Sequence, residues 1–174
     1  MKELRYPIGR FIIPENITDS QRQQWIQEIR EAPGQLRKSV KDLTKEQTDT
    51  PYREGGWTIR QVVHHISDSH LNGYVRFKLA LTEEQPLIRG YIQEKWANLE
   101  DTKKTPLEVS ISLLESLHER WIVLLNSLQR QDFMKEFNHP ESGLATLETA
   151  LGLYAWHGRH HIAQITSLRK RQGW

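Results

Sequence analysis

The chain reads LETALGLYAWHGRHHIAQI from Leu147 to Ile165, a pattern typical of a helix with one buried side. Its apolar and small residues recur at helical spacing and continue one turn further, forming a stripe of Leu147, Leu151, Tyr154, Gly158, Ile165 and Leu168. At about 100° per residue, His157 and His161 lie on or beside this stripe, where aliphatic side chains are expected. Two inward-facing imidazoles one turn apart need polar partners, and one metal ion would satisfy both.

The same pattern permits a second interpretation of this pair. His157 and His161 would then be core histidines bonded to backbone carbonyls or to Tyr154. No glutamate follows His157, so the segment is not the His-Glu-x-x-His motif of zinc proteases. The inward Glu-x-x-His pairs of di-iron bundles are absent as well.

The composition narrows the classes of protein to which the chain can belong. It has 174 residues, no cysteine and a formal net charge of +2. Without cysteine, a metal would need His, Asp or Glu ligands. No apolar run reaches the ~20 residues that span a bilayer, and no apolar leader follows Met1, so we expect a cytoplasmic protein with no membrane partner. The basic cluster at residues 169–171 has no accompanying nucleic-acid motif, which argues against that partner.

A first long helix is predicted after the N-terminal arm. Thr18 has the character of an N-cap, with Gln21 placed for a capping box. The apolar phase then runs to Leu43 across the pair Pro33-Gly34. Because the phase is not interrupted there, we predict one kinked helix and not two.

Two more helices are predicted between that segment and the last one. Thr58 is the expected N-cap of the second, and Thr105 is the expected N-cap of the third, with Pro106 as its first helical residue. The connector between them is longer than bundle loops usually are. It contains Tyr91 and Trp96, and we expect it to form a lid or a pocket wall.

The predicted fold class is therefore all-α, a four-helix bundle with a long connector between the second and third helices. Residues 1–174 are expected to form a single domain, in which residues 1–17 are an extended arm lying on the bundle. Residues 133–143 are expected to form a loop or a short hairpin.

The second helix offers further histidines for a shared site. His70 points to the centre of the core and reads best as a satisfied core histidine, while His64 and His65 lie on opposite flanks. Periodicity does not separate these two as a third ligand. A polar row continues from His65 at helical spacing through Ser69, Asn72 and Arg76, and it indicates either a cleft between helices or a solvated face.

The remaining histidines carry weaker signals. We interpret His64, His118 and His160 as ordinary surface or flank residues, although His64 and His160 are also candidates to hydrogen-bond a ligand. His139 precedes a proline in a loop and is expected to be uninvolved.

Several motifs together resemble one known family, the DinB/YfiT-like superfamily. GGWTIRQVVHHISDSH at residues 55–70 is similar to its second-helix signature, and WHGRHHIAQI at residues 156–165 is similar to its last-helix signature. Further stretches resemble the YfiT subgroup of bacilli: YPIG at 6–9, YVRFKLALTEE at 74–84 and RQGW at 171–174. The resemblance covers essentially the whole chain.

The resemblance implies a four-helix bundle with one divalent metal ion per subunit, zinc first and nickel as the alternative. It implies His65, and not His64, as the second-helix ligand, with His157 and His161 from the last helix. Gly158 would let the neighbouring helix come close enough to supply the third ligand. Candidates for support behind the ligands are Gln61, Asp68, His64 and His160.

The resemblance also bears on activity and partners. Members of the family are described as metal-dependent hydrolases, in which the cation activates water. Relatives are thiol S-transferases that use bacillithiol or a similar low-molecular-weight thiol, and the subgroup resembles homodimers. We therefore expect a small-molecule substrate, with S-transfer as the alternative activity. A metal-stabilised protein that binds a small ligand without turnover is the second alternative. No general base is assigned.

Overall fold

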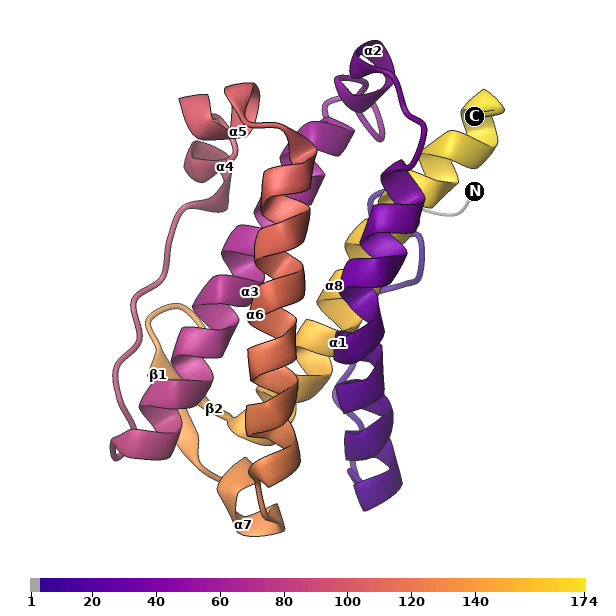
Figure 1. The fold of residues 1–174 in the computed structure, drawn as a ribbon. Helices are drawn as coiled ribbons and strands as arrows, with labels where there is room; N and C mark the ends of the chain where they lie inside the picture. The colour runs from indigo at the N-terminus through magenta and orange to yellow at the C-terminus, as the bar shows by residue number, and fades with distance from the viewer. Residues whose placement is uncertain (1–3) are drawn as a thin grey trace.

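Four long helices dominate the computed structural model, which describes residues 4–174 (Figure 1). They are α1 (Asp19–Val40), α3 (Ile59–Thr82), α6 (Leu107–Ser127) and α8 (Leu147–Gln172). The shorter elements between them are α2 (Lys45–Thr48), α4 (Gln93–Trp96), α5 (Glu100–Lys104), α7 (Arg130–Phe133), β1 (Glu136–His139) and β2 (Gly143–Thr146). The prediction of an all-α four-helix bundle is confirmed, with one small hairpin added. Within the described residues, no helix is both long and apolar enough to cross a membrane.

Three of the long helices begin at a side-chain cap. Thr18 accepts a hydrogen bond from the backbone N–H of Gln21, but the Gln21 side chain bonds Gln24 and not Thr18, so the predicted capping box is only half formed. Thr146 accepts a hydrogen bond at the start of α8. Thr58 and Gln61 form a reciprocal capping box at the start of α3. Each cap satisfies a backbone donor that the first helical turn leaves unpaired.

The predicted start of the third helix is wrong by one residue. Thr105 is not its N-cap, because Thr105 already terminates α5, where its N–H is bonded to the carbonyl of Asp101. Pro106 is extended, with φ −58° and ψ 142°, and it is the residue that precedes α6. A proline side chain has no acceptor, so α6 begins without a side-chain cap.

Helix α1 continues through Pro33, as the unbroken apolar phase predicts. It ends at Val40 and not at Leu43, because Lys41 already has an extended ψ of 136° and Asp42 then adopts a left-handed conformation with φ 62°. A proline inside a helix removes one hydrogen-bond donor from the helical ladder. In α1 the carbonyl that loses its partner in this way is that of Ile29.

The long helices are connected in an unusual order, which Figure 1 makes visible. Helices α1 and α8 lie side by side and run in the same direction, while α3 and α6 lie side by side and run the opposite way. Contacts of α1 with α6 and of α3 with α8 close the ring. Because α3 and α6 are parallel, the segment between them must return along the whole bundle. This geometry explains the long connector that the sequence predicts.

The hairpin lies toward the end of the bundle opposite the C-terminus of α8 (Figure 1). Strands β1 and β2 pair in antiparallel register from Glu136 with Thr146 to His139 with Gly143. Gly143 has a φ of +75°, which a residue without a Cβ adopts at little cost. The connector joins this hairpin through hydrogen bonds in both directions, from Ile88 N–H to the Asn138 carbonyl and from Asn138 N–H to the Pro86 carbonyl.

The buried interior consists of two apolar clusters with polar side chains between them. One cluster surrounds Phe77 and Trp121, and the other surrounds Leu36 and Ile66. On α3 and α8 the residues between these clusters include buried histidines at 70, 160 and 161. Burying polar groups at mid-bundle is costly unless they are paired, so this layer requires an account of its partners.

The N-terminal arm lies against α8 over its described part. The indole N–H of Trp156 donates to the Gly9 carbonyl at 3.2 Å, and the Gln164 side chain donates to the Arg5 carbonyl at 2.9 Å. Phe11 contacts the ring of Trp156. Residues 1–3 of the predicted arm lie outside the described residues.

Substitution of Gly73 by alanine is expected to lower the free energy of unfolding by about 1–3 kcal/mol. A Cβ at this position of α3 would lie 2.4 Å from the ring of Tyr154, which is itself buried. The matched control is Gly34→Ala in α1, where nothing lies within 4 Å and the new side chain favours the helix by roughly 0.5–1 kcal/mol. Urea denaturation of both variants tests the pair. Equal changes in the free energy of unfolding would show that the Tyr154 ring does not require the space left by the missing Cβ of Gly73.

Candidate metal centre

Three histidines named from the sequence come together between α3 and α8. One ring nitrogen from each of His65, His157 and His161 lies within 4.8 Å of the others. The Nε2 atoms of His65 and His157 are 3.2 Å apart. Imidazoles whose nitrogen atoms converge in this way are arranged as ligands of a shared cation are.

The structure separates His65 from its neighbour His64. His64 faces α6, where its Nδ1 lies 2.7 Å from the hydroxyl of Ser110. His65 faces α8 and packs against the ring of Trp57, with 4.6 Å between centroids. Of the two adjacent histidines, His65 is therefore the one whose ring nitrogen lies with those of His157 and His161.

Gln164 forms a hydrogen bond with the ring nitrogen of His161 that faces away from the cluster, and this contact was not predicted from the sequence. Its side-chain carbonyl accepts from Nδ1 of His161 at 2.8 Å, while its amide nitrogen donates to the Arg5 carbonyl and contacts Nε2 of His160 at 3.1 Å. Since the Arg5 carbonyl only accepts, the amide orientation is fixed and His161 carries its proton on Nδ1. Its Nε2 is then free to face the cluster. A glutamine three residues after a ligand on one helix face is the signal that could have identified it.

His157 is supported by a different partner. Its Nδ1 lies 3.2 Å from Nε2 of His70, which has no exposed surface. The prediction that His70 is a satisfied core histidine is confirmed, since its other ring nitrogen meets His118. The prediction that His118 is a surface or flank residue is wrong, because its ring is buried between α6 and its contacts on α1 and α3.

Gly158 has a different role from the one predicted for it. A Cβ there would meet the Cβ of Ala32 at 3.3 Å and the ring of His70 at 3.6 Å. The glycine therefore makes room for α1 and for His70, and not for His65.

Burial keeps the clustered imidazoles neutral. It lowers the pKa of His65 to about 4 and lowers the pKa of His157 and of His161 well below the ordinary value. Desolvation is the largest cause in each case, and the neighbouring histidines add to it. A metal ligand must be a neutral imidazole with a free lone pair, and these residues have that form at neutral pH. The donor set therefore fits a divalent cation.

The four residues that were predicted to hydrogen-bond the candidate ligands differ in where they lie. His160 is buried, stacks on Trp156 and reaches the site through Gln164, so its interpretation as a surface residue is wrong. Gln61 caps α3 and donates to the Ala97 carbonyl, which ties down the connector. Burial raises the pKa of Asp68 to about 6, but no hydrogen bond joins its carboxylate to the three histidines within residues 4–174. His64 belongs to the α6 side, as described above, and its interpretation as a surface or flank residue is also wrong because it is buried.

Two cavities meet at His157. One, of about 340 Å³, lies between the N-terminal arm, Trp57 and the outer side of α8. The other, of about 470 Å³, lies between α3, α8, the hairpin and the connector. Gln93 and Glu94 of α4 also line both, so the connector forms the wall that was predicted for it. Tyr91 lines the second cavity and packs against Trp96 at 4.4 Å.

The polar row on α3 lines the second cavity in part. Ser69 and Arg76 face it, and the Arg76 guanidinium donates to the hydroxyl of Tyr154 at 3.1 Å. Asn72 instead donates to the backbone carbonyl of Asp68. His139, which was expected to be uninvolved, also lines this cavity. The hairpin brings it there, and its loop position alone gave no sign of that.

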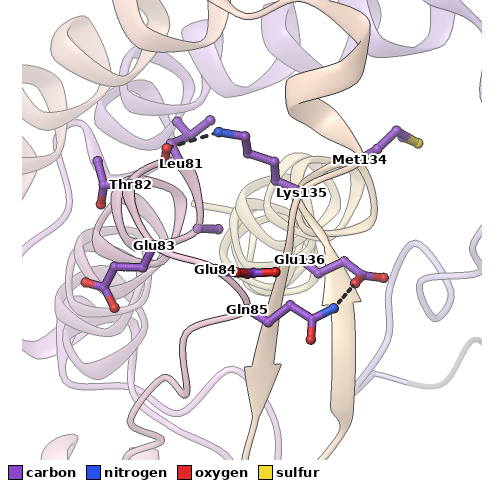
Figure 2. Close-up of a pocket in the computed structure, with 9 residues that line it drawn as sticks. Leu81, Thr82, Glu83, Glu84, Gln85, Met134, Lys135 and Glu136 are labelled. Carbon is purple, nitrogen blue, oxygen red and sulfur yellow. Dashed lines mark hydrogen bonds between the residues drawn. The ribbon is translucent and has the colours of Figure 1, made fainter.

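A third cavity, of about 410 Å³, lies at the hairpin end of the bundle (Figure 2). Lys135 donates to the carbonyl of Leu81 and Gln85 donates to Glu136, so its polar groups partly satisfy one another. Its described lining contains carboxylates but no histidine. It therefore offers no counterpart to the chemistry at His157.

Comparison with known proteins gives a consistent result. The chain matches the DinB superfamily over residues 28–165, a range that contains all three histidines. It is 59% identical over its whole length to proteins from Bacillus cereus and Bacillus thuringiensis subsp. konkukian that are named "Putative metal-dependent hydrolase", each covered completely. A solved structure, YfiT from Bacillus subtilis, is 51% identical with a TM-score of 0.95 over 98% of both chains, and is described as "a probable metal-dependent hydrolase with an unusual four-helix bundle topology".

Proposed function

Because the chain belongs to the DinB superfamily, we propose that it is a metal-dependent hydrolase whose cation is held by His65, His157 and His161. The observation that carries the proposal is the convergence of three neutral ring nitrogens within 4.8 Å at the meeting point of two cavities. A buried cluster of this kind without a cation would leave polar atoms facing one another at a cost in stability.

The ligand set favours a borderline divalent ion. Imidazole nitrogens suit zinc and nickel, and zinc is our first choice with nickel as the alternative. Three protein ligands leave at least one position open, which is the arrangement of catalytic zinc sites and not of structural ones. A divalent cation bound there would lower the pKa of a water molecule to about 7 and so supply a nucleophile at neutral pH.

The surrounding residues have roles that follow from their contacts. Gln164 holds the ring of His161 in place, and Trp57 covers one side of His65, so that the ligands are fixed and partly shielded from solvent. Glu94 is the carboxylate that lines both cavities, and its charge acts on His65. We assign it the role of proton acceptor for the attacking water, which is the usual task of a carboxylate beside a catalytic cation.

A thiol S-transferase is the second candidate function, and the pair of cavities favours it. Transfer to or from a thiol requires two substrates at the reacting centre at once. The cavities on either side of His157 offer separate spaces for a thiol such as bacillithiol and for an electrophile. A hydrolase needs only one of them.

Turnover that depends on added zinc is the expected result for the purified protein. Metal-free protein, with and without zinc, is mixed with chromogenic carboxylic and phosphoric esters, and separately with bacillithiol and a haloaromatic electrophile. Hydrolysis should fall at least about 100-fold in His161→Ala, which loses a ligand, while His64→Ala serves as the matched control with an intact ligand set. Glu94→Gln should lower kcat by about 10²–10⁴-fold without loss of zinc.

The two assays separate the candidates. Zinc-dependent ester cleavage without a thiol supports the hydrolase, and conjugate formation that needs both thiol and zinc supports the transferase. Tight zinc binding with turnover in neither assay would contradict both and leave a protein that binds a small ligand without reaction.

A further inference from the structure

A row of imidazoles connects helix α1 to the candidate ligand His157. The carbonyl of Ile29 lies 2.6 Å from Nδ1 of His118, and Nε2 of His118 lies 2.9 Å from Nδ1 of His70. Nε2 of His70 in turn lies 3.2 Å from Nδ1 of His157. Three rings therefore stand in series between a backbone carbonyl and the ring nitrogen that faces the cluster.

The Ile29 carbonyl is available because of Pro33. In an α-helix the carbonyl of residue 29 accepts from the backbone N–H of residue 33, four positions later. Pro33 lies inside α1 and has no N–H. The carbonyl is buried, since Ile29 has no exposed surface, and it needs a donor from elsewhere. His118 of α6 provides that donor.

The hydrogen bond between His118 and the Ile29 carbonyl determines which nitrogen donates at every later step along the row of imidazoles. A carbonyl only accepts, so Nδ1 of His118 carries a proton. A neutral imidazole has one proton, so Nε2 of His118 is an acceptor and Nδ1 of His70 must donate to it. By the same step Nε2 of His70 accepts from Nδ1 of His157. The opposite tautomer at any ring would place two protons, or two lone pairs, against each other.

Burial and packing around His118 and His70 keep their rings in these hydrogen bonds. His70 is fully buried and His118 is 2% exposed, so water does not compete for their nitrogen atoms. The two rings stack with 5.0 Å between centroids, and Trp121 meets both edge to face. Burial lowers the pKa of His118 to about 4 and that of His70 well below its ordinary value, which keeps both rings neutral.

We propose that His118 and His70 are positioning residues that, starting from the Ile29 carbonyl released by Pro33, fix His157 as the Nδ1–H tautomer and direct its Nε2 lone pair at the metal site. The row does not touch substrate and acts only through His157. The tautomer is a property of the chain without any ion, and only the consequence for metal affinity rests on the proposed function.

Loss of the acceptor nitrogen on His118 would reverse the direction of the hydrogen bond between His70 and His157. His70 would then have no acceptor for its Nδ1 proton and would gain by moving that proton to Nε2, where it could donate to His157. His157 would in response carry its proton on Nε2, facing the cluster. A cation would have to displace that proton, so its affinity would fall.

The first test is nuclear magnetic resonance on the metal-free protein labelled with ¹⁵N. Long-range correlation of ring nitrogens with carbon-bound ring protons distinguishes the two neutral tautomers. The expected result is a protonated Nδ1 and an unprotonated Nε2 at His118, His70 and His157. An Nε2–H form at His118 or at His157 would overturn the proposal.

The second test uses two substitutions at His118. Leucine fills the site without an acceptor, whereas the side-chain carbonyl of glutamine reaches the position of the lost Nε2. We expect His118→Leu to raise the Nε2–H population at His157 and to weaken zinc binding about 10–100-fold by calorimetry. His118→Gln should restore most of both.

A purely structural role for His118 predicts a different outcome. The two variants would then change zinc affinity equally, and the tautomer of His157 would stay unaltered in both, which contradicts the proposal. Failure of the proposed function is distinguishable, because a wild-type protein that binds no zinc would still show the predicted tautomers.

Discussion

Replacing His65 with alanine should abolish the rise in melting temperature that zinc causes, whereas replacing the adjacent His64 should leave that rise intact. Zinc at 100 times its dissociation constant stabilises a folded protein by about 2.7 kcal/mol. For a chain of this size that corresponds to a shift of roughly 5–10 °C. His65 faces the two candidate ligands on α8, whereas His64 faces Ser110 on α6, so only His65→Ala removes a member of the proposed ligand set.

The measurement is the difference in melting temperature with zinc and with a chelator, determined for each variant separately. Both substitutions remove a buried imidazole, and both are expected to lower the baseline stability. Because only the zinc-induced difference is compared, this loss cancels. A full zinc shift in His65→Ala, or its disappearance in His64→Ala, would show that the cluster does not bind metal as proposed.

Acid should destabilise the metal-free protein steeply between pH 6.5 and pH 5. In the unfolded chain each histidine takes up a proton near pH 6.5. Six histidines do so in the folded state only at much lower pH, because desolvation lowers the pKa of each: His65, His70, His118, His157, His160 and His161. Above pH 6.5 both states are neutral and nothing is lost. Below it the unfolded state alone gains protons, so the free energy of unfolding falls.

The size of this effect is set by linkage. Each such histidine contributes up to about 2 kcal/mol of destabilisation at pH 5. Together the six approach the whole stability of an ordinary domain, roughly 5–15 kcal/mol, so the metal-free chain should unfold in this window. Urea midpoints in chelator at pH 7.5, 6.5 and 5.5 provide the measurement. Saturating zinc should move the acid transition to lower pH. A midpoint that stays constant from pH 7.5 to 5.5 would contradict the prediction.

Local signals were sufficient to predict most of the helical framework. Thr58 caps the start of α3 as predicted, because an N-cap hydroxyl bonds a backbone N–H within the next turn. The pair His157 and His161 follows from helical spacing alone. In each case the information lies within one or two turns of a single helix.

Features that depend on packing between helices were not predictable in this way. The spacing of His118 from Ile111 and Trp121 places it on the buried stripe of α6, and that signal was available. Its partner was not, because pairing with Ile29 requires α1 and α6 to be neighbours at a particular height. The same holds for His139, which reaches the second cavity only when the hairpin folds against the connector.

The polar layer between the two apolar clusters also has a consequence for how the helices align. Apolar side chains tolerate a shift of one helix along another, since one aliphatic contact replaces another at a modest cost. The imidazole row does not, because sliding α6 by a single turn would separate His118 from both Ile29 and His70 and leave three buried polar groups without partners. The hydrogen bonds between the histidines therefore fix the height of α1, α3, α6 and α8 relative to one another. The aliphatic contacts alone would allow several such alignments.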